Sequence, residues 1–348
     1  MGNPKAQDER FLRKAIAEAL RGYGHTSPNP AVGAVIVKHG KILGTGWHQK
    51  AGAPHAEIEA LHSLKNLKAA RGATIYITLE PCSTHGKTPP CTEAIVQAGI
   101  ARVVYGATDP NPRHAGRAKI LLEKSGISVT SGILEKKCAS INEAWNVWIS
   151  KSRPLVIAKA GMSLDGRITS PPGQRWITSK ESRADAMRLR STCDAILVGG
   201  ETVRADNPKL TVRGIPGARQ PIRAIWTKSG NLPSSAHLFT DRHKNKTRVF
   251  QGVSLRETLR LLAKEGVQSV LIEGGGRTLG EAFDRKLVDR VVFYVAPVIF
   301  GGGTPAVGGR GAVSPELGGL LEDVEYQGLG PDIKISGRVI PARQEAIL

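Results

Sequence analysis

The sequence predicts an α/β protein that is divided into two domains. Its 348 residues are enough for two ordinary domains. Segments with strand-like and helix-like patterns alternate along the chain, which is typical of α/β folds. The alternation stops near Ser152 and restarts after Pro154. We therefore expect a first domain over residues 1–150 and a second over 151–348.

The first half predicts a three-layer domain. Apolar residues recur with helical spacing in its helices, and β-rich runs bounded by turn residues mark its strands. The S-P-N-P sequence and Gly99 stop two of the helices. In chain order we expect a helix over 8–22, a hairpin of strands over 31–37 and 41–47, a helix over 55–64, a strand over 73–79, a helix over 91–99, a strand over 101–107, a helix over 117–126, a strand over 127–130 and one helix over 134–151.

The second half repeats the same kind of alternation. A Gly-Gly turn joins its second strand to helical residues, and its last strand is a long apolar run. We see no internal repeat between the halves. The expected elements are a strand over 154–161, a strand and helix over 194–208, strands over 220–227, 247–252 and 268–275, a helix over 276–287 and a strand over 289–303.

Composition narrows the class of protein. The chain is 40% hydrophobic and 23% charged, as globular proteins are. No apolar run approaches the ~18 residues that span a bilayer, and the N-terminus has no signal-peptide pattern, so we expect no membrane association and a cytoplasmic location. The net charge of +19 favours an anionic partner such as a phosphorylated metabolite, a nucleotide cofactor or nucleic acid. The basic residues are spread along the chain, which argues against nucleic acid.

A candidate metal site comes from two separated segments. His55 precedes a short helix, and Cys82 and Cys91 are separated by eight residues further on. Three such ligands leave a fourth position for water, which is the catalytic arrangement of Zn²⁺. Glu57 lies two residues after His55 and is predicted to move protons without binding the metal. Taken alone, a His-x-Glu at a helix start is more often a surface feature, and two cysteines with this spacing are more often core residues. The combined pattern favours a zinc deaminase.

The second half offers a weaker signal. Gly274, Gly275 and Gly276 lie between a strand and a helix, where backbone amides can bind phosphate. The spacing to Gly280 does not satisfy the G-x-G-x-x-G fingerprint. From the spacing alone, a purely structural tight turn is as plausible as a cofactor site.

These motifs resemble the riboflavin-biosynthesis bifunctional deaminase–reductase family. The resemblance rests on "SPNPAVGAVIV", "GAPHAEIEAL", "TLEPCSTHGKTPPC" and "DPNP", and on "KAGMSLDGRI", "WITS", "LVGGETVRADNPKLTVR" and "IEGGGRTLG". The enlarged loop between the two cysteines is a feature of that family. The resemblance implies a cytidine-deaminase-like α/β/α domain followed by a dihydrofolate-reductase-like α/β domain. It also implies one Zn²⁺ per chain, NADPH, and two reactions.

The resemblance implies a substrate and a set of contacts. Zinc hydroxide would deaminate 2,5-diamino-6-ribosylamino-4(3H)-pyrimidinone 5′-phosphate, and NADPH would then reduce the ribosyl to the ribityl chain. Glu57 would be catalytic, and the metal ligands would be His55, Cys82 and Cys91. The deaminase substrate contacts would be Asn29, His48, His85 and Lys87; the cofactor contacts Met162, Trp176, Thr178, Thr202, Asp206, Gly274, Gly275 and Gly276; and the reductase substrate contacts Lys159, Gln174, Arg190, Leu210, Arg213 and Glu273.

Two alternative functions fit the sequence less well. A deaminase of nucleic acid would have a short C-x-x-C loop and no use for the second half, and neither expectation fits. A nucleotide-sensing protein with dead sites conflicts with the intact set of His55, Glu57, Cys82 and Cys91. We therefore expect a small phosphorylated pyrimidine as partner, no nucleic acid, and by resemblance a homo-oligomer, either a dimer or a tetramer.

Overall fold

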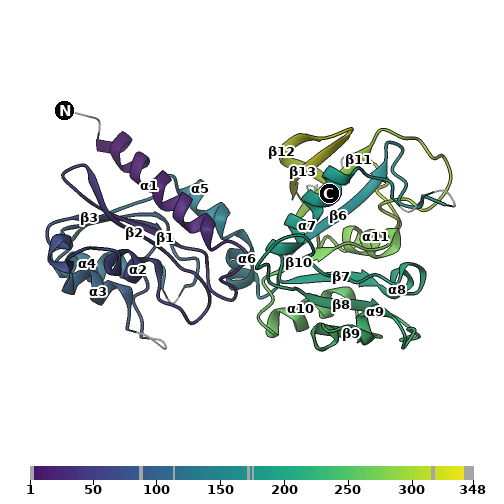
Figure 1. Cartoon of the computed structure of the whole chain (residues 1–348), viewed down its shortest axis with the longest axis horizontal. Coiled ribbons are helices and arrows are strands. Elements are labelled where there is room, and N and C mark those ends of the chain that lie inside the picture. The colour runs from purple at the N-terminus through teal and green to yellow at the C-terminus, as the bar shows by residue number, and fades with distance from the viewer. Residues whose placement is uncertain are drawn as a thin grey trace, which may run out of the picture. The chain divides into compact units, whose positions relative to one another are not determined.

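The chain consists of two compact units, residues 1–152 and 153–348 (Figure 1). The structure is a computed structural model, and it describes residues 4–85, 89–112, 114–170, 173–174, 176–314 and 318–340. Each unit has its own sheet and its own hydrophobic core. The α/β class predicted for both halves is confirmed.

Unit 1 is built on a five-stranded sheet in the order β2-β1-β3-β4-β5. Strand β1 runs antiparallel to β2 and β3, whereas β3, β4 and β5 are parallel. The start of β1 and the ends of β2 and β3 therefore meet at one edge, which brings together Asn29, His48 and Cys82. The strands are β1 (Gly33–Lys38), β2 (Lys41–Trp47), β3 (Thr74–Leu79), β4 (Arg102–Ala107) and β5 (Ser128–Ser131).

Helices cover both faces of this sheet, which confirms the three layers (Figure 1). Successive side chains of a strand point to opposite faces. Ile75 and Ile77 accordingly pack with one set of helices, and Tyr76 between them packs with the other. The first set is α2 (Ala56–His62), α3 (Cys91–Gln97) and α4 (Arg117–Lys124); the second is α1 (Pro4–Arg21), α5 (Glu135–Ile141) and α6 (Glu143–Lys151); a short 3₁₀ helix, η1 (Leu67–Ala70), precedes β3.

The prediction of one helix over 134–151 is wrong, because the chain breaks between α5 and α6 at Asn142. The Asn142 side chain accepts a hydrogen bond from the Ala31 backbone N–H (2.7 Å) and donates one to the Ala31 carbonyl (2.9 Å). Asn142 is buried, so these two bonds satisfy groups that water cannot reach. The break thus fixes the backbone that follows Asn29.

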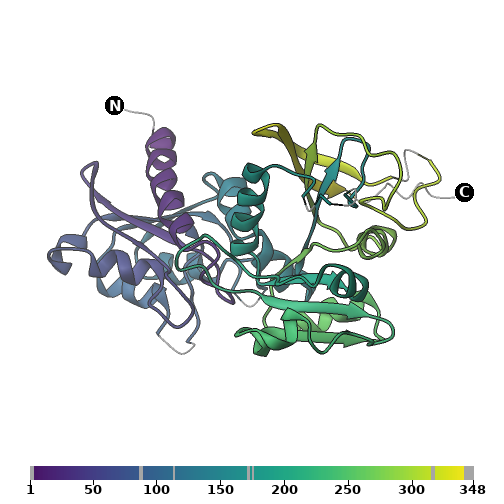
Figure 2. The ribbon, with the colours of Figure 1, turned by 45° about the vertical axis from the view of Figure 1, so that its right-hand side comes forward.

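Unit 2 has an eight-stranded sheet in the order β12-β13-β11-β6-β10-β7-β8-β9. Strands β11, β6, β10, β7, β8 and β9 are parallel, and the β12–β13 hairpin adds two antiparallel strands at one edge (Figures 1 and 2). The strands are β6 (Leu155–Ser163), β7 (Ala195–Gly199), β8 (Ile222–Thr227), β9 (Thr247–Gln251), β10 (Ser269–Ile272), β11 (Arg290–Ala296), β12 (Leu320–Leu329) and β13 (Asp332–Ile340).

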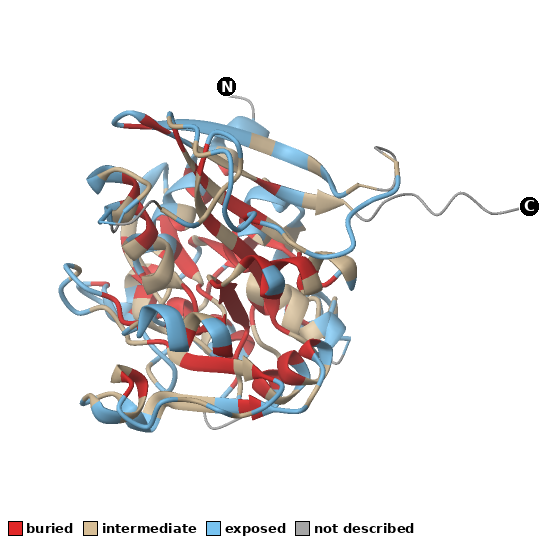
Figure 3. Ribbon diagram, turned by 90° about the vertical axis from the view of Figure 1, so that its right-hand side faces the viewer, coloured by how far each residue is buried: buried red, intermediate tan, exposed pale blue. Residues whose placement is uncertain are grey.

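The core of unit 2 lies on the central strands and under α10 and α11. Figure 3 shows the buried residues gathered in the interior, with exposed residues around them. Helix α10 presents Leu255, Leu259 and Leu262 to it. The helices are α7 (Lys180–Thr192), α8 (Gly200–Asp206), α9 (His237–Thr240), α10 (Leu255–Lys264) and α11 (Gly276–Asp284), with a 3₁₀ helix η2 (Lys244–Lys246). Among the helices within the described residues, none is long and apolar enough to cross a membrane.

The strand predicted over 289–303 is wrong at its end, because β11 stops at Ala296 before Pro297. The residues that follow bond to the loop after β6 instead. The Leu164 N–H donates to the Val298 carbonyl, and the Asp165 carboxylate accepts from the Gly301 N–H, both at 2.8 Å. The sequence reading also missed α7, α10 and the β12–β13 hairpin.

Candidate active sites

Three predicted metal ligands meet in unit 1. His55 is the N-cap of α2, Cys91 is the first residue of α3, and Cys82 follows β3. Their donor atoms all lie within 4.8 Å of one another. His55 Nδ1 is 3.3 Å from Cys91 Sγ and 3.6 Å from Cys82 Sγ. A tetrahedral zinc ion holds nitrogen and sulfur ligands about 3.6 Å apart, so the triad fits this metal.

The protonation of the Cys82 and Cys91 thiols is also compatible with a bound cation. Hydrogen bonding with Cys91 lowers the pKa of the Cys82 thiol to about 4. The same hydrogen bond, together with burial, raises the pKa of Cys91. The two sulfurs therefore share one proton, and a divalent cation binds best where both are thiolates. The Cys91 N–H donates to Cys82 Sγ (3.2 Å), which fixes the direction of that sulfur.

Glu57 lies beside this triad on the first turn of α2. Its side chain is buried, with 3% of the residue exposed. Burial, followed by the nearby Cys82, raises the pKa of the Glu57 carboxyl to about 7. A carboxyl with that pKa can both accept and release a proton near neutral pH. The site thus combines a metal position with an acid–base group that is not one of the three ligands.

Asn29 and His48 form a second layer at the same sheet edge. The Asn29 amide lies 3.1 Å from His48 Nε2, and His48 Nδ1 lies 3.0 Å from the Pro54 carbonyl. Because a carbonyl only accepts, His48 carries its proton on Nδ1, and Nε2 then accepts from the Asn29 Nδ2 group. Burial lowers the pKa of His48, which keeps the ring neutral. Asn29 Oδ1 is therefore left as an acceptor.

The other two predicted deaminase contacts lie in the cysteine loop. The His85 side chain is 72% exposed and pairs with Glu93, with Nε2 3.5 Å from the carboxylate. Lys87 lies outside the described residues. The structure thus brings Asn29, His48, His55 and Glu57 together and leaves His85 on the surface.

Glu80 is a residue that the sequence reading missed. Its buried carboxylate accepts hydrogen bonds from the backbone N–H groups of Asp109 (3.2 Å), Gly116 (3.0 Å) and Ala118 (3.1 Å). It therefore ties the segment after β4 to the segment that carries Cys82. A glutamate directly between an apolar strand and Pro81-Cys82 is the signal that could have found it.

In unit 2, three predicted residues form one buried ion cluster. The register pairs Ile272, the last residue of β10, with Ala158 of β6. Glu273, directly after β10, therefore lies beside Lys159 of β6. Arg190 of α7 donates from Nε (2.5 Å) and Nη2 (2.7 Å) to the Glu273 carboxylate, and Lys159 Nζ lies 3.7 Å from it. Burial alone would raise the pKa of Glu273, but Arg190 and Lys159 hold it at about 2. The cluster therefore keeps a charged carboxylate between two cations.

Close packing alone requires glycine in the turn before α11, whether or not the turn binds a ligand. A Cβ on Gly274 would lie 2.9 Å from Val198, and one on Gly276 would lie 2.1 Å from the Pro305 carbonyl. Gly275 has φ +48, and a Cβ there would lie 3.2 Å from Thr202 Oγ1. The first turn of α11 carries no acidic side chain, so its amides and dipole suit the pyrophosphate of a dinucleotide.

The remaining predicted contacts are dispersed over unit 2. Leu210 is buried, and Arg213 Nη1 donates to Thr211 Oγ1 (3.1 Å). Trp176 is exposed, with the Arg183 guanidinium 4.9 Å above its ring. Thr178 packs against Gly161, the neighbour of Met162 on β6, whereas Gln174 and Asp206 are exposed.

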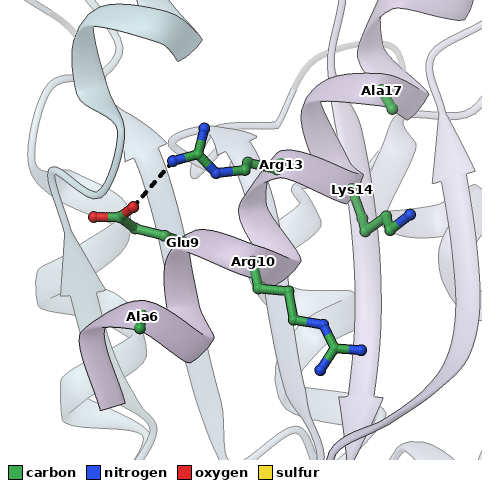
Figure 4. Close-up of a pocket in the computed structure, with 6 residues that line it drawn as sticks. All are labelled: Ala6, Glu9, Arg10, Arg13, Lys14 and Ala17. Atoms are coloured by element: carbon green, nitrogen blue, oxygen red, sulfur yellow. Dashed lines mark hydrogen bonds and ion pairs between the residues drawn. The ribbon is translucent and has the colours of Figure 1, made fainter. Parts of the chain in front are cut away.

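A shallow depression in unit 1 is lined by none of the predicted site residues (Figure 4). All six of its residues, Ala6, Glu9, Arg10, Arg13, Lys14 and Ala17, belong to α1. Arg13 pairs with Glu9 at 3.1 Å. Charged side chains along one side of a surface helix are typical of a solvated face, so we assign it no function.

Comparison with known proteins agrees with this geometry. The sequence pattern of the family described as "RibD C-terminal domain" matches residues 154–335, and that of the "Cytidine and deoxycytidylate deaminase zinc-binding region" matches residues 5–107. The chain is 38% identical to the riboflavin biosynthesis protein RibD of Aquifex aeolicus, over 94% of this chain and 97% of that protein. It is 37% identical to RibD of Escherichia coli, over 85% and 89%.

Solved structures show the same likeness. Acinetobacter baumannii RibD superposes with a TM-score of 0.89 at 33% identity, covering 97% of this chain and 100% of that one. A diaminohydroxyphosphoribosylaminopyrimidine deaminase/5-amino-6-(5-phosphoribosylamino)uracil reductase from Thermotoga maritima gives 0.87 at 34%, with the same coverage. The chain therefore belongs to the RibD family, the bifunctional deaminases and reductases of riboflavin biosynthesis, and its cofactors are Zn²⁺ and NADPH.

Proposed function

We propose that the chain deaminates 2,5-diamino-6-ribosylamino-4(3H)-pyrimidinone 5′-phosphate and then reduces the product to 5-amino-6-ribitylamino-uracil 5′-phosphate. The observation that carries the proposal is the triad of His55, Cys82 and Cys91 beside buried Glu57. The name of the Thermotoga maritima relative, which covers 97% of this chain, supports the substrate. The net charge of +19 suits a phosphorylated substrate.

In unit 1, we assign the metal to His55, Cys82 and Cys91 and proton transfer to Glu57. Zinc, when bound, is a Lewis acid that lowers the pKa of water to about 7. Glu57 takes the proton of the attacking water and delivers protons to the ring and to the leaving ammonia. Asn29 offers an acceptor to the pyrimidine, and neutral His48 holds Asn29 in that direction. His85 and Lys87 are proposed to contact the pyrimidine of the substrate.

In unit 2, we assign the reduction to the cluster of Lys159, Arg190 and Glu273. NADPH, when bound, supplies a hydride to C1′ of the opened sugar. The Lys159 ammonium, which faces Glu273 on one side, orients the sugar oxygens. Arg190 also donates to Glu273 and to the Thr211 carbonyl. We assign the substrate phosphate to Arg190 and Arg213, because a guanidinium pairs bidentately with phosphate. Leu210 and Gln174 are proposed to line the substrate.

The remaining predicted contacts are proposed to bind the cofactor. Met162, Trp176, Thr178, Thr202 and Asp206 would surround NADPH. Gly274, Gly275 and Gly276 would bring the amides of α11 to its pyrophosphate.

One assay tests both halves of this proposal. Zinc-loaded protein is given the pyrimidinone phosphate and NADPH, and ammonia release and NADPH oxidation are followed separately. We expect ammonia first and NADPH oxidation after it. Absence of ammonia release would refute the assignment of the substrate. Ammonia without oxidation would leave unit 2 with another substrate.

We further propose that the protein is a cytoplasmic homo-oligomer, a dimer or a tetramer. Exposed apolar side chains of the β12–β13 hairpin, Leu320, Tyr326 and Ile333, offer a surface for such contacts. All four cysteines are free thiols, which fits a reducing compartment. Sedimentation analysis of the zinc-loaded protein measures the assembly, and a monomer at micromolar concentration would rule it out.

A further inference from the structure

The segment between α8 and β8 has an unusual backbone. Residues 207–213 form neither helix nor strand, and they carry Leu210 and Arg213. Asn207 has φ +41 and Leu210 has φ +48, in the left-handed region that side chains disfavour. Residues hold such angles only where their surroundings impose them, and they gather at ligand sites. The surroundings of this segment therefore decide where Leu210 and Arg213 lie.

Two arginines from neighbouring elements hold the backbone carbonyls of the segment. Arg223 of β8 is 1% exposed, pairs with Asp241 (2.6 Å) and donates to the Lys209 carbonyl (3.1 Å). Arg190 donates to the Thr211 carbonyl (3.2 Å). Each arginine therefore binds a single backbone carbonyl of the segment.

Gln220 makes a more complete contact. Its side-chain amide accepts from the Val212 N–H (2.9 Å) and donates to the Val212 carbonyl (2.9 Å). Two such bonds reproduce the pairing of a neighbouring β-strand, and they fix the peptide planes on both sides of Val212. Gln220 is itself held, because Lys246 Nζ donates to its backbone carbonyl (2.6 Å). Because Arg213 directly follows Val212, the orientation of the Val212 peptide sets the position from which the Arg213 side chain extends.

We propose that Gln220 is a positioning residue of the reductase site, which aims Arg213 at the phosphate of the substrate. It touches neither substrate nor cofactor and acts through Val212. The proposal rests on the proposed function of Arg213. It predicts that Gln220 governs the affinity for the phosphorylated substrate and leaves NADPH binding and the deaminase unchanged.

The first test is Gln220→Met, which preserves the length of the side chain and removes both hydrogen bonds. We expect the KM of reduction for the phosphorylated substrate to rise on the order of tenfold, since small displacements of binding groups have effects of this size. The Kd of NADPH and the rate of ammonia release should match the wild type. A normal substrate KM, or an equal loss of NADPH affinity, would overturn the proposal.

Gln220→Glu is the second variant, in case the first does not fold. It keeps an acceptor for the Val212 N–H and places a second acceptor against the Val212 carbonyl, so the substrate KM should again rise. Ser254→Ala is the matched control, because it removes the hydrogen bond that caps α10 and touches neither the segment nor the site. It should lower the midpoint of unfolding and leave the substrate KM unchanged. If Ser254→Ala raised that KM as much, a loss of stability would account for the effect of Gln220.

Arg213→Ala separates this proposal from the one on which it rests. If Arg213→Ala leaves the substrate KM unchanged, the proposed function of Arg213 is wrong. If it raises the KM and Gln220→Met adds its full effect in the double variant, Gln220 acts elsewhere and the positioning role is wrong. We expect the double variant to resemble Arg213→Ala alone, because two residues that act through one contact are not additive.

Discussion

Glu57 shows how burial converts an ordinary carboxyl into an acid–base group. It lies two residues after the N-cap of α2 yet is only 3% exposed. His55 and Cys82 nearby are two of the proposed metal ligands, so the proposed proton carrier lies on the short helix that begins beside one of them. The spacing of residues in the sequence predicted this cluster. His55 and Glu57 are two residues apart, and only the approach of Cys82 and Cys91 to them is a long-range feature. The backbone groups of Ala31 and Val212 are held by the side-chain amides of Asn142 and Gln220, and such bonds leave no pattern in a sequence.

The role of Glu57 is tested by removing its charge at constant shape. Glu57→Gln should retain zinc, because the three ligands remain, and ammonia release should fall by about 10²–10⁴-fold, the usual contribution of such a group. His55→Ala should lose both zinc and activity. Metal analysis and an ammonia assay on the same samples check this. Zinc lost from Glu57→Gln would make the glutamate a ligand instead.

The ion cluster of unit 2 predicts a dependence of stability on pH. The pKa of Glu273 is about 2 in the folded chain, below its ordinary value of 4.5. The ionised carboxylate therefore stabilises the fold above pH 4.5, by on the order of 3 kcal/mol, and this contribution is lost as the pH falls toward 2. Glu273→Gln should be less stable than the wild type at neutral pH, with a difference that shrinks below pH 4.5. Denaturant unfolding of both proteins from pH 2 to 7 measures it; a constant difference would contradict the assignment.

At the scale of elements, the well-predicted parts are those with local signals. The β1–β2 hairpin turns at His39 and Gly40, both with positive φ, after the buried apolar run of β1. The stripe of α10, with Ser254 as N-cap, was readable in the sequence and was overlooked. Strand β12 could not be read, because most of its residues are exposed at a sheet edge and show no alternation. The break at Asn142 depends on Ala31, 111 residues earlier.

Helix α11 packs so closely that it predicts an intolerant position. A Cβ on Gly280 would lie 1.5 Å from the Gly308 carbonyl oxygen. Gly280→Ala should therefore displace the 306–309 loop and lower the free energy of unfolding by about 3 kcal/mol or more. Gly302→Ala is the control, since a Cβ there meets nothing within 4 Å. Chemical denaturation of the two variants should separate them, and similar stabilities would show that the loop yields freely.

The whole molecule combines two folding units with different cofactors. The hydrophobic clusters of unit 1 are built from residues before 152, and those of unit 2 from residues after 153. A ligand stabilises the unit that binds it, by mass action. A chelator should therefore lower one calorimetric transition, and NADPH should raise another. A single transition that responds to both ligands would mean that the units unfold together.

The joint between the units is only three residues long. Helix α6 ends at Lys151 and β6 begins at Leu155. Ser152 has φ +52, and Arg153 is held by Asp289 through bonds of 2.6 and 2.7 Å. A protease cleaves segments that can unfold locally and enter its active site, and exposed loop tips are the usual segments of this kind. Limited proteolysis should thus nick loops within the units before it severs the joint, so the two activities should remain on one polypeptide through partial digestion.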